Sequence, residues 1–361
     1  MKTVGIIGGG IHGMTSAIAL AEVGFKVYVI EKNNDILQGT SGSTHNRAHV
    51  GYHYPRSIVT AEECFLGLQK FQGKYREALS YPKDVYYLIA KDSGTTVEFF
   101  KMFCELMKFP YEITLPSDEF INKDLIENGF KVNEPVFNLF KLKDIFEKKI
   151  KELNITVYKS AYFSHFDTKD KQYEITCNRK GDITKIYVDF IVNATYAYTN
   201  NVMETMHLED DMTLYTLQHT EVVVLRTKKY VPSLTVMDGP YVSLMPYANP
   251  EPNLYLLYDV VNSIQEKYEG YYFFSGDDYM SNADKMIYNC HKYFPFELEY
   301  VSSLYGSRPI PINPSENKGD CRMTRIKCHK KYPGVYSILE GKFISAPLVA
   351  DNIVSLINNE K

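Results

Sequence analysis

The sequence predicts an α/β protein with two domains, one built on a parallel sheet and the other rich in β-strands. Three observations support this prediction. A strand–helix–strand pattern fills the first thirty residues, a polar loop follows at 33–57, and strand patterns dominate the stretch from 219 to 258. The length of 361 residues also fits two domains, since globular domains average about 150 residues.

The N-terminal unit begins with the short apolar run Thr3–Ile7, which is typical of a strand buried on both faces of a parallel sheet. Ala, Leu and Ile recur at helical spacing over 14–23, and Gly24 ends this helix. A second apolar strand, Lys26–Ile30, leads directly to Glu31. Together these segments form one complete βαβ unit.

A G-x-G-x-x-G motif lies between the first strand and the helix. Gly8 permits the tight turn, Gly10 lets the backbone approach a pyrophosphate, and Gly13 lets the helix pack closely on the strand. Glu31 stands 23 residues after Gly8, at the end of the second strand, where a carboxylate binds a ribose diol. This Rossmann-type pattern indicates a dinucleotide site. The acidic residue favours NAD or FAD over NADP, whose 2′-phosphate it would repel.

Helical spacing and apolar runs predict the remaining elements in order. We expect helices at 58–79, 97–107, 140–153, 278–293 and 342–358, and strands at 84–90, 155–158, 173–177, 186–191, 219–225, 241–245, 254–258, 298–305 and 334–339. The dinucleotide domain is therefore expected to be discontinuous, comprising 1–78, 145–205 and 305–361. The substrate domain comprises 79–144 and 206–304.

Composition excludes two classes of partner. A net charge of −4 argues against electrostatic capture of nucleic acid, and the absence of an apolar run of about 18 residues excludes a membrane span. The six cysteines contain no C-x-x-C pair, which predicts no metal site and a reduced, cytoplasmic protein. The expected partner is a small-molecule substrate, and the oligomeric state stays open.

The polar loop and three later stretches together resemble one family. His45-Asn46 and the His49 to Tyr54 stretch are similar to the second flavin-binding segment of the FAD-dependent oxidoreductases related to D-amino acid oxidase, glycine oxidase and L-2-hydroxyglutarate oxidase. The stretches 189–195, 306–309 and 339–344 are similar to this family's Val-Asn-Ala-Thr strand end, its Gly-x-Arg-Pro turn beside the flavin and its closing turn into the last helix. Tyr196 stands where the family has glycine.

This resemblance implies a glutathione-reductase-like FAD-binding domain of the D-amino acid oxidase type, with FAD as the cofactor. Flavin chemistry then implies oxidation of a C–N or C–O bond in a small polar substrate, by hydride transfer to flavin N5. The substrate is expected to be an amino acid, a hydroxy acid or a modified sugar. The implied FAD-binding residues are Gly8, Gly10, Ile11, His12, Gly13, Glu31, Lys32, Ser41, Thr44, Asn46, Phe163, Ala194, Thr195, Gly341, Lys342, Phe343 and Ile344.

The resemblance implies three catalytic residues, each with an alternative role. Arg308 either clamps a substrate carboxylate bidentately or closes a structural ion pair. His49 and His53 face the flavin in the family, where each acts as a base, a polar ligand or a covalent tether, or else is simply hydrogen-bonded within the loop. Two other functions stay open at this stage: an NAD-dependent dehydrogenase, and a non-catalytic flavin-fold subunit of a larger complex.

Overall fold

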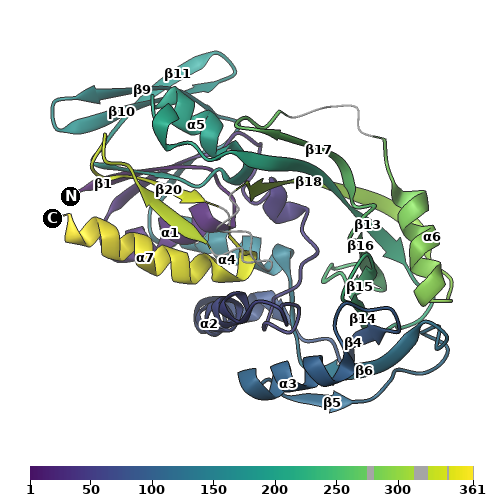
Figure 1. Ribbon diagram of the computed structural model, residues 1–361. Helices are drawn as coiled ribbons and strands as arrows, with labels where there is room; N and C mark the ends of the chain where they lie inside the picture. Colours follow the sequence, from purple (N-terminus) through teal and green to yellow (C-terminus); the bar gives the residue numbers. More distant parts are fainter. Residues whose placement is uncertain (275–279, 313–323, 340, 361) are drawn as a thin grey trace.

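Two large sheets organise the chain, and helices cover their outer faces (Figure 1). The computed structural model describes residues 1–274, 280–312, 324–339 and 341–360. Within these residues, one six-stranded sheet is mainly parallel, and one nine-stranded sheet is mainly antiparallel. The architecture confirms the expected α/β fold with a second, β-rich part.

The six-stranded sheet carries the predicted βαβ unit. Its strand order is β19-β20-β12-β1-β2-β8, and every neighbouring pair is parallel except β19 with β20. The bounds are β1 Thr3–Ile7, β2 Lys26–Ile30, β8 Thr156–Tyr158, β12 Phe190–Asn193, β19 Arg325–Cys328 and β20 Val335–Leu339. Because β1 lies between β2 and β12, the Gly8 turn stands at the centre of the sheet's carboxyl edge.

Helices pack on one face of this sheet, and a small antiparallel sheet covers the other. The helices α1 and α7 pack against each other, with α2 and α4 beyond them (Figure 1). Their bounds are α1 Ile11–Glu22, α2 Ile58–Tyr75, α4 Leu139–Glu152 and α7 Ala346–Asn359. On the opposite face lie α5 Thr199–Thr205 and the strands β9 Tyr162–Lys169, β10 Gln172–Arg179 and β11 Asp182–Val188.

The nine-stranded sheet has the order β17-β13-β16-β15-β14-β4-β6-β5, with β18 also paired to β13. Its bounds are β4 Val85–Ala90, β5 Tyr111–Ile113, β6 Ile126–Val132, β13 Tyr215–Arg226, β14 Ser233–Met237, β15 Val242–Pro246, β16 Leu254–Asp259, β17 Ile264–Gly270 and β18 Glu299–Pro311. The helices α3 Val97–Met107 and α6 Ala283–Tyr293 pack on it, and β3 Leu79–Ser80 pairs with β7 Val136–Phe137. The predicted domain limits stay a prediction.

One local expectation differs from the structure in a way that affects the site. The family resemblance placed Gly306 to Pro309 in a turn after a strand, whereas β18 continues through these residues to Pro311. Arg308 is paired with Gln218 of β13 in this ladder. Proline lacks the N–H that a strand with neighbours on both edges needs. Pro309 is tolerated because β18 is an edge strand that pairs with β13 alone among the described strands.

A buried ion pair fastens the polar loop to the nine-stranded sheet. The Arg47 guanidinium donates from Nη1 to Glu134 Oε2 at 3.2 Å, and from Nη2 to Thr235 Oγ1 at 2.5 Å. The Tyr87 hydroxyl donates to the same carboxylate at 2.6 Å, and the Val50 N–H donates to Oε1 at 2.9 Å. Burial raises the pKa of Glu134, and the adjacent guanidinium opposes this shift. Arg47 is therefore a structural residue.

Removing one partner of this pair is expected to destabilise the fold strongly. Arg47→Met leaves the Glu134 carboxylate buried without its cation, which costs about 3–5 kcal/mol of unfolding free energy. The double variant Arg47→Met with Glu134→Gln should lose less than the sum of the two single losses, because the uncompensated charge is gone. Urea unfolding of the four proteins measures this coupling, and additive losses would contradict it.

Candidate active site

The Gly8–Gly13 turn has the geometry that dinucleotide binding requires. Gly8 adopts φ +105°, and a Cβ on Gly13 would lie 1.9 Å from the Gly8 carbonyl oxygen. Only glycine fits at either position, so the start of α1 packs directly against the end of β1. The helix N-terminus is thereby directed at the carboxyl edge of the sheet, where its free N–H groups attract phosphate.

Glu31 lies beside this turn, as the sequence predicts. Its carboxylate accepts hydrogen bonds from the Gly9 N–H at 2.6 Å and the Asn33 N–H at 2.7 Å. Burial raises the pKa of Glu31, and these two backbone N–H groups partly offset the shift. The side chain therefore orders the glycine turn as well as facing the cavity.

A cavity of about 710 Å³ runs along this edge, within the size range of cofactor sites. Predicted residues that line it are Gly8, Gly10, Ile11, His12, Glu31, Lys32, Ser41, Thr44, Phe163, Ala194, Thr195, Gly341 and Phe343. Four other predicted residues, Gly13, Asn46, Lys342 and Ile344, do not line it. The volume and the glycine-lined turn fit FAD, and all of these contacts stay predictions for the bound cofactor.

His12 places both ring nitrogens in an enclosed position at the cavity wall. Its ring is buried at the cavity wall, and within the described part of the chain neither nitrogen makes a hydrogen bond of normal geometry. Burial lowers the pKa of His12 to about 4, with the Lys342 backbone opposing the shift, so the imidazole is neutral at pH 7. A buried polar group without a partner is costly, which fits a site completed by a cofactor.

The closing turn brings the C-terminal segment against His12. Gly341 adopts φ +119°, and a Cβ on it would lie 3.0 Å from His12 Nε2. The Lys342 ammonium lies 4.2 Å from the centre of the Tyr54 ring, and Ile344 is buried in the core. Glu340, also part of the expected turn, lies outside the described residues. A short 3-10 turn, Phe343–Ser345, precedes α7.

The nine-stranded sheet supplies a polar group next to the cavity. Gly306 and Ser307 of β18 line the cavity, and Ser307 exchanges hydrogen bonds with Thr40. Arg308 follows on the same strand, and it donates from Nε to Gln218 Oε1 at 2.8 Å and from Nη1 to the Tyr258 hydroxyl at 3.0 Å. Alternate residues share one face of a strand, so Arg308 lies on the same face as Gly306.

His45 completes this group from the polar loop. Its ring centre lies 5.7 Å from that of Tyr258, and its Nε2 lies 3.1 Å from the Leu256 carbonyl oxygen. Burial and the Arg47 charge lower the pKa of His45 to about 3, which leaves the ring neutral. The loop and the sheet thus bring His45, Tyr258 and Arg308 together, although they are far apart in the sequence.

His49 and His53 pack against each other next to the polar loop's Tyr54. Their ring centres are 5.6 Å apart, and neither residue lines the cavity. Burial lowers the pKa of His49 well below its usual value, and the Arg47 charge adds to this effect. The Tyr54 hydroxyl lies 3.4 Å from His49 Nε2. Their catalytic role stays a prediction.

Several cavity residues lack a motif that identifies them. Tyr198 places its ring 3.3 Å from the Lys32 ammonium, while His219, Gln265 and Phe273 reach the cavity from β13, β17 and the segment after β17. Their positions depend on how the two sheets meet. Tyr196 also lines the cavity, and it is the one that the sequence comparison singles out, because it stands where the family has glycine and adopts φ +57°.

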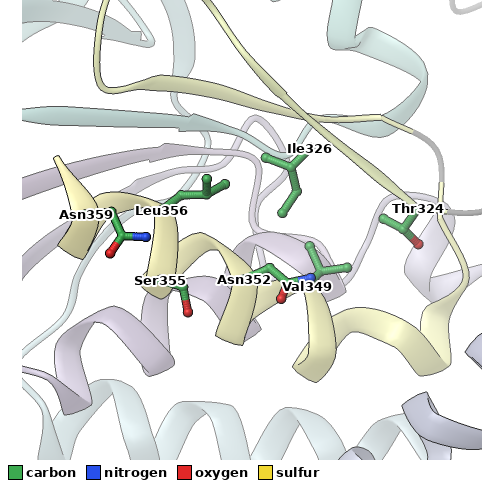
Figure 2. A pocket seen from close by; sticks show the side chains of 7 residues that line it. All are labelled: Thr324, Ile326, Val349, Asn352, Ser355, Leu356 and Asn359. Atoms are coloured by element: carbon green, nitrogen blue, oxygen red, sulfur yellow. The ribbon is translucent and has the colours of Figure 1, made fainter.

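Other features of the described residues lie apart from this cavity. A second groove of about 380 Å³ separates β19 from α7 and is lined by Ile326, Val349 and Leu356 among others (Figure 2). Asp211, His329 and Ser337 form a hydrogen-bonded chain like a hydrolase triad, but Ser337 is buried. No cluster of three metal-ligating side chains and no helix suited to crossing a bilayer occurs among the residues described.

Comparison with known proteins identifies the family. Residues 3–354 match the family described as FAD dependent oxidoreductase (DAO), and the chain belongs to it. It is 26% identical over 385 residues to the FAD-dependent monooxygenase kojA of Aspergillus flavus, a match that spans 99% of this chain and 86% of that protein.

Solved structures share the fold. Glycine oxidase from Geobacillus kaustophilus superposes with a TM-score of 0.75 at 13% identity, covering 100% of this chain and 96% of that one. L-α-glycerophosphate oxidase from Mycoplasma pneumoniae, with FAD bound, gives 0.75 at 17% identity, with 99% and 95% covered. The protein is therefore an FAD-dependent enzyme, and neither the NAD-dependent dehydrogenase nor the non-catalytic subunit is retained.

Loss of the Glu31 carboxylate should weaken FAD binding. Glu31→Ala removes both the expected ribose acceptor and the anchor of the Gly9 N–H, so we expect the FAD dissociation constant to rise about 10- to 150-fold, equivalent to about 1.5–3 kcal/mol. Fluorescence titration of apoprotein with FAD measures this constant. Glu127→Ala, an exposed substitution on β6, serves as the control. Wild-type affinity in Glu31→Ala would refute the assignment.

The buried neutral histidines should make stability fall in mild acid. A histidine whose pKa is lowered in the folded state binds its proton more readily when unfolded, so unfolding free energy decreases as pH drops below about 6.5. For His49 this loss amounts to about 1.4 kcal/mol per pH unit. Urea unfolding between pH 7.5 and 5.5 should therefore show a shallower slope in His49→Gln. The exposed His291→Gln should keep the wild-type slope.

Proposed function

We propose that the protein oxidises a C–N or C–O bond of a small substrate that carries a carboxylate. Bound FAD supplies the chemistry, since the flavin accepts a hydride at N5. An amino acid, a hydroxy acid or a carboxylated sugar meets this description. The observation that carries the proposal is the Arg308, Tyr258 and His45 group, which does not itself line the cavity but adjoins it through the lining residues Thr44, Gly306 and Ser307.

Arg308 provides the positive charge that a carboxylate requires. Gln218 and Tyr258 hold its guanidinium by two hydrogen bonds, so its plane is fixed before substrate binds. A fixed planar fork orients a carboxylate in a way that a flexible ammonium does not. This orientation matters because the donor carbon must lie about 3–3.5 Å from the accepting atom.

The neutral side chains around Arg308 suit a polar group more than a second charge. His45 is neutral, and its burial between β16 and the polar loop keeps it so over the physiological range. It therefore does not repel a substrate ammonium. Tyr258 contributes a hydroxyl at the same place. Together they favour a substrate with a hydroxyl or amino group next to its carboxylate.

The turn after Gly341 supports the proposal from the other end of the cavity. A helix N-terminus carries partial positive charge, and the turn Phe343–Ser345 leads into α7 with Gly341 and Phe343 in the cavity wall. We infer that these backbone N–H groups stabilise negative charge on the pyrimidine end of the cofactor. The Lys342 ammonium lies over the ring of Tyr54, which in turn packs against His49.

Anaerobic mixing tests the reaction class. Purified protein with FAD bound is mixed with separate pools of amino acids, hydroxy acids and carboxylated sugars while the flavin absorbance is followed. Bleaching by one pool identifies the donor, and the recovery rate in air distinguishes an oxidase from a dehydrogenase. Incorporation of labelled oxygen into product would instead indicate a monooxygenase, the activity in the name of the Aspergillus relative. No bleaching by any pool contradicts the proposal.

Replacement of Arg308 should impair catalysis while FAD stays bound. Arg308→Ala removes the carboxylate anchor, so we expect kcat/KM to fall about 100-fold or more. Arg308→Lys should recover part of this loss, because a point charge attracts the carboxylate without orienting it. Flavin reduction rates against substrate concentration measure both variants, with FAD occupancy checked by absorbance. Unchanged kinetics in fully loaded Arg308→Ala would mean that Arg308 is structural.

A further inference from the structure

The cavity has an aromatic wall at the end where Glu31 lies. Tyr198, in the 3-10 turn Tyr196–Tyr198 that follows β12, is half-buried and lines the cavity there. The ammonium of Lys32, the residue directly after Glu31, lies 3.3 Å from the centre of the Tyr198 ring. An acidic residue at the end of the second strand of a βαβ unit binds the adenosine ribose of a dinucleotide. Tyr198 therefore stands next to the place where this ribose is expected.

Two rings from the nine-stranded sheet continue this wall. Phe273, in the segment after β17, has its ring centre 5.1 Å from that of Tyr198. The ring centre of His219, on β13, lies 4.5 Å from that of Phe273. Phe273 and His219 are each only 5% exposed, and both line the cavity. We call Tyr198, Phe273 and His219 the aromatic wall.

Hydrogen bonds from α5 hold the segment after β17 against the six-stranded sheet. The buried Asn200 side chain donates from Nδ2 to the Tyr271 carbonyl oxygen at 2.9 Å. The Asn201 side chain accepts from the Phe273 N–H at 3.3 Å. Since α5 lies on one face of the six-stranded sheet and Phe273 follows a strand of the other sheet, these bonds join the two sheets. The aromatic wall is thus built from both of them.

The aromatic wall offers rings without a formal charge. Burial lowers the pKa of His219, and the Glu266 charge opposes this shift, so the imidazole is mainly neutral at pH 7. Asn201 and Gln265 line the cavity beside the wall and add amide groups. Nucleic-acid bases bind aromatic side chains by stacking, and each base presents a flat face and hydrogen-bonding edges. The wall and its amides therefore suit a neutral, flat heteroaromatic ring better than an anion or a flexible chain.

We propose that the aromatic wall binds the adenine ring of FAD, so that the nine-stranded sheet helps to hold the cofactor. Adenine is attached to the ribose that Glu31 is expected to bind, which places the base at this end of the cavity. The Lys32 side chain is exposed, so it can leave the face of the Tyr198 ring to the base. This proposal concerns the cofactor and does not depend on the substrate.

Removal of single rings tests the proposal. Tyr198→Leu and Phe273→Leu should each raise the FAD dissociation constant about tenfold, the scale of one base stacked on an aromatic side chain. Tyr198→Phe keeps the ring and should keep the wild-type constant. Tyr271→Leu, an exposed change on the same segment and outside the cavity, is the matched control for Phe273→Leu. Fluorescence titration of the apoprotein measures each constant, and its melting temperature verifies folding.

Two fragments of the cofactor show which part of it the wall contacts. ADP carries the adenosine without the flavin, and FMN carries the flavin without the adenosine. Calorimetry should show that both leucine variants bind ADP about tenfold more weakly than the wild type, while their affinity for FMN is unchanged. FAD-loaded protein should bind no ADP. Unchanged FAD affinity in the leucine variants, equal losses for ADP and FMN, no ADP binding to wild-type apoprotein, or ADP binding to the FAD-loaded protein would each overturn the proposal.

Discussion

The buried ion pair between Arg47 and Glu134 fixes the loop on which both halves of the active site depend. Residues before Arg47 line the flavin cavity and supply His45, while residues after it supply His49 and Tyr54. Because the Glu134 carboxylate also binds the Val50 N–H and the Tyr87 hydroxyl, the loop is attached to the nine-stranded sheet at several points. The loop that contributes Ser41 and Thr44 to the cavity wall is thereby held on the nine-stranded sheet.

Burial of the side chains around the Arg47–Glu134 pair also determines the electrostatics of the site. Four charged or ionisable groups are enclosed near the loop, and the structure keeps His45 and His49 neutral while the guanidinium of Arg47 is paired. In the proposed function, Arg308 is the carboxylate anchor on the sheet next to the cavity, and its fixed orientation rather than a titrating base positions the substrate. Because the unfolded chain binds protons on these histidines more readily than the folded protein, stability falls in mild acid while the folded histidines stay neutral.

Local sequence alone determined the dinucleotide half of the protein. The glycines at 8, 10 and 13, the short apolar strands and Glu31 each act through the backbone within thirty residues, so their pattern predicts both the βαβ unit and its ligand class. The family resemblance added the loop and the closing turn, and most of the implied residues line the cavity. Tertiary structure decided the rest. The pairing of Arg47 with Glu134, the position of His49 relative to the cavity, and the continuation of Gly306–Pro309 as part of β18 all depend on partners more than thirty residues away. Long-range pairing across a sheet leaves no periodic pattern in the sequence, and burial of a polar side chain is set by what packs over it.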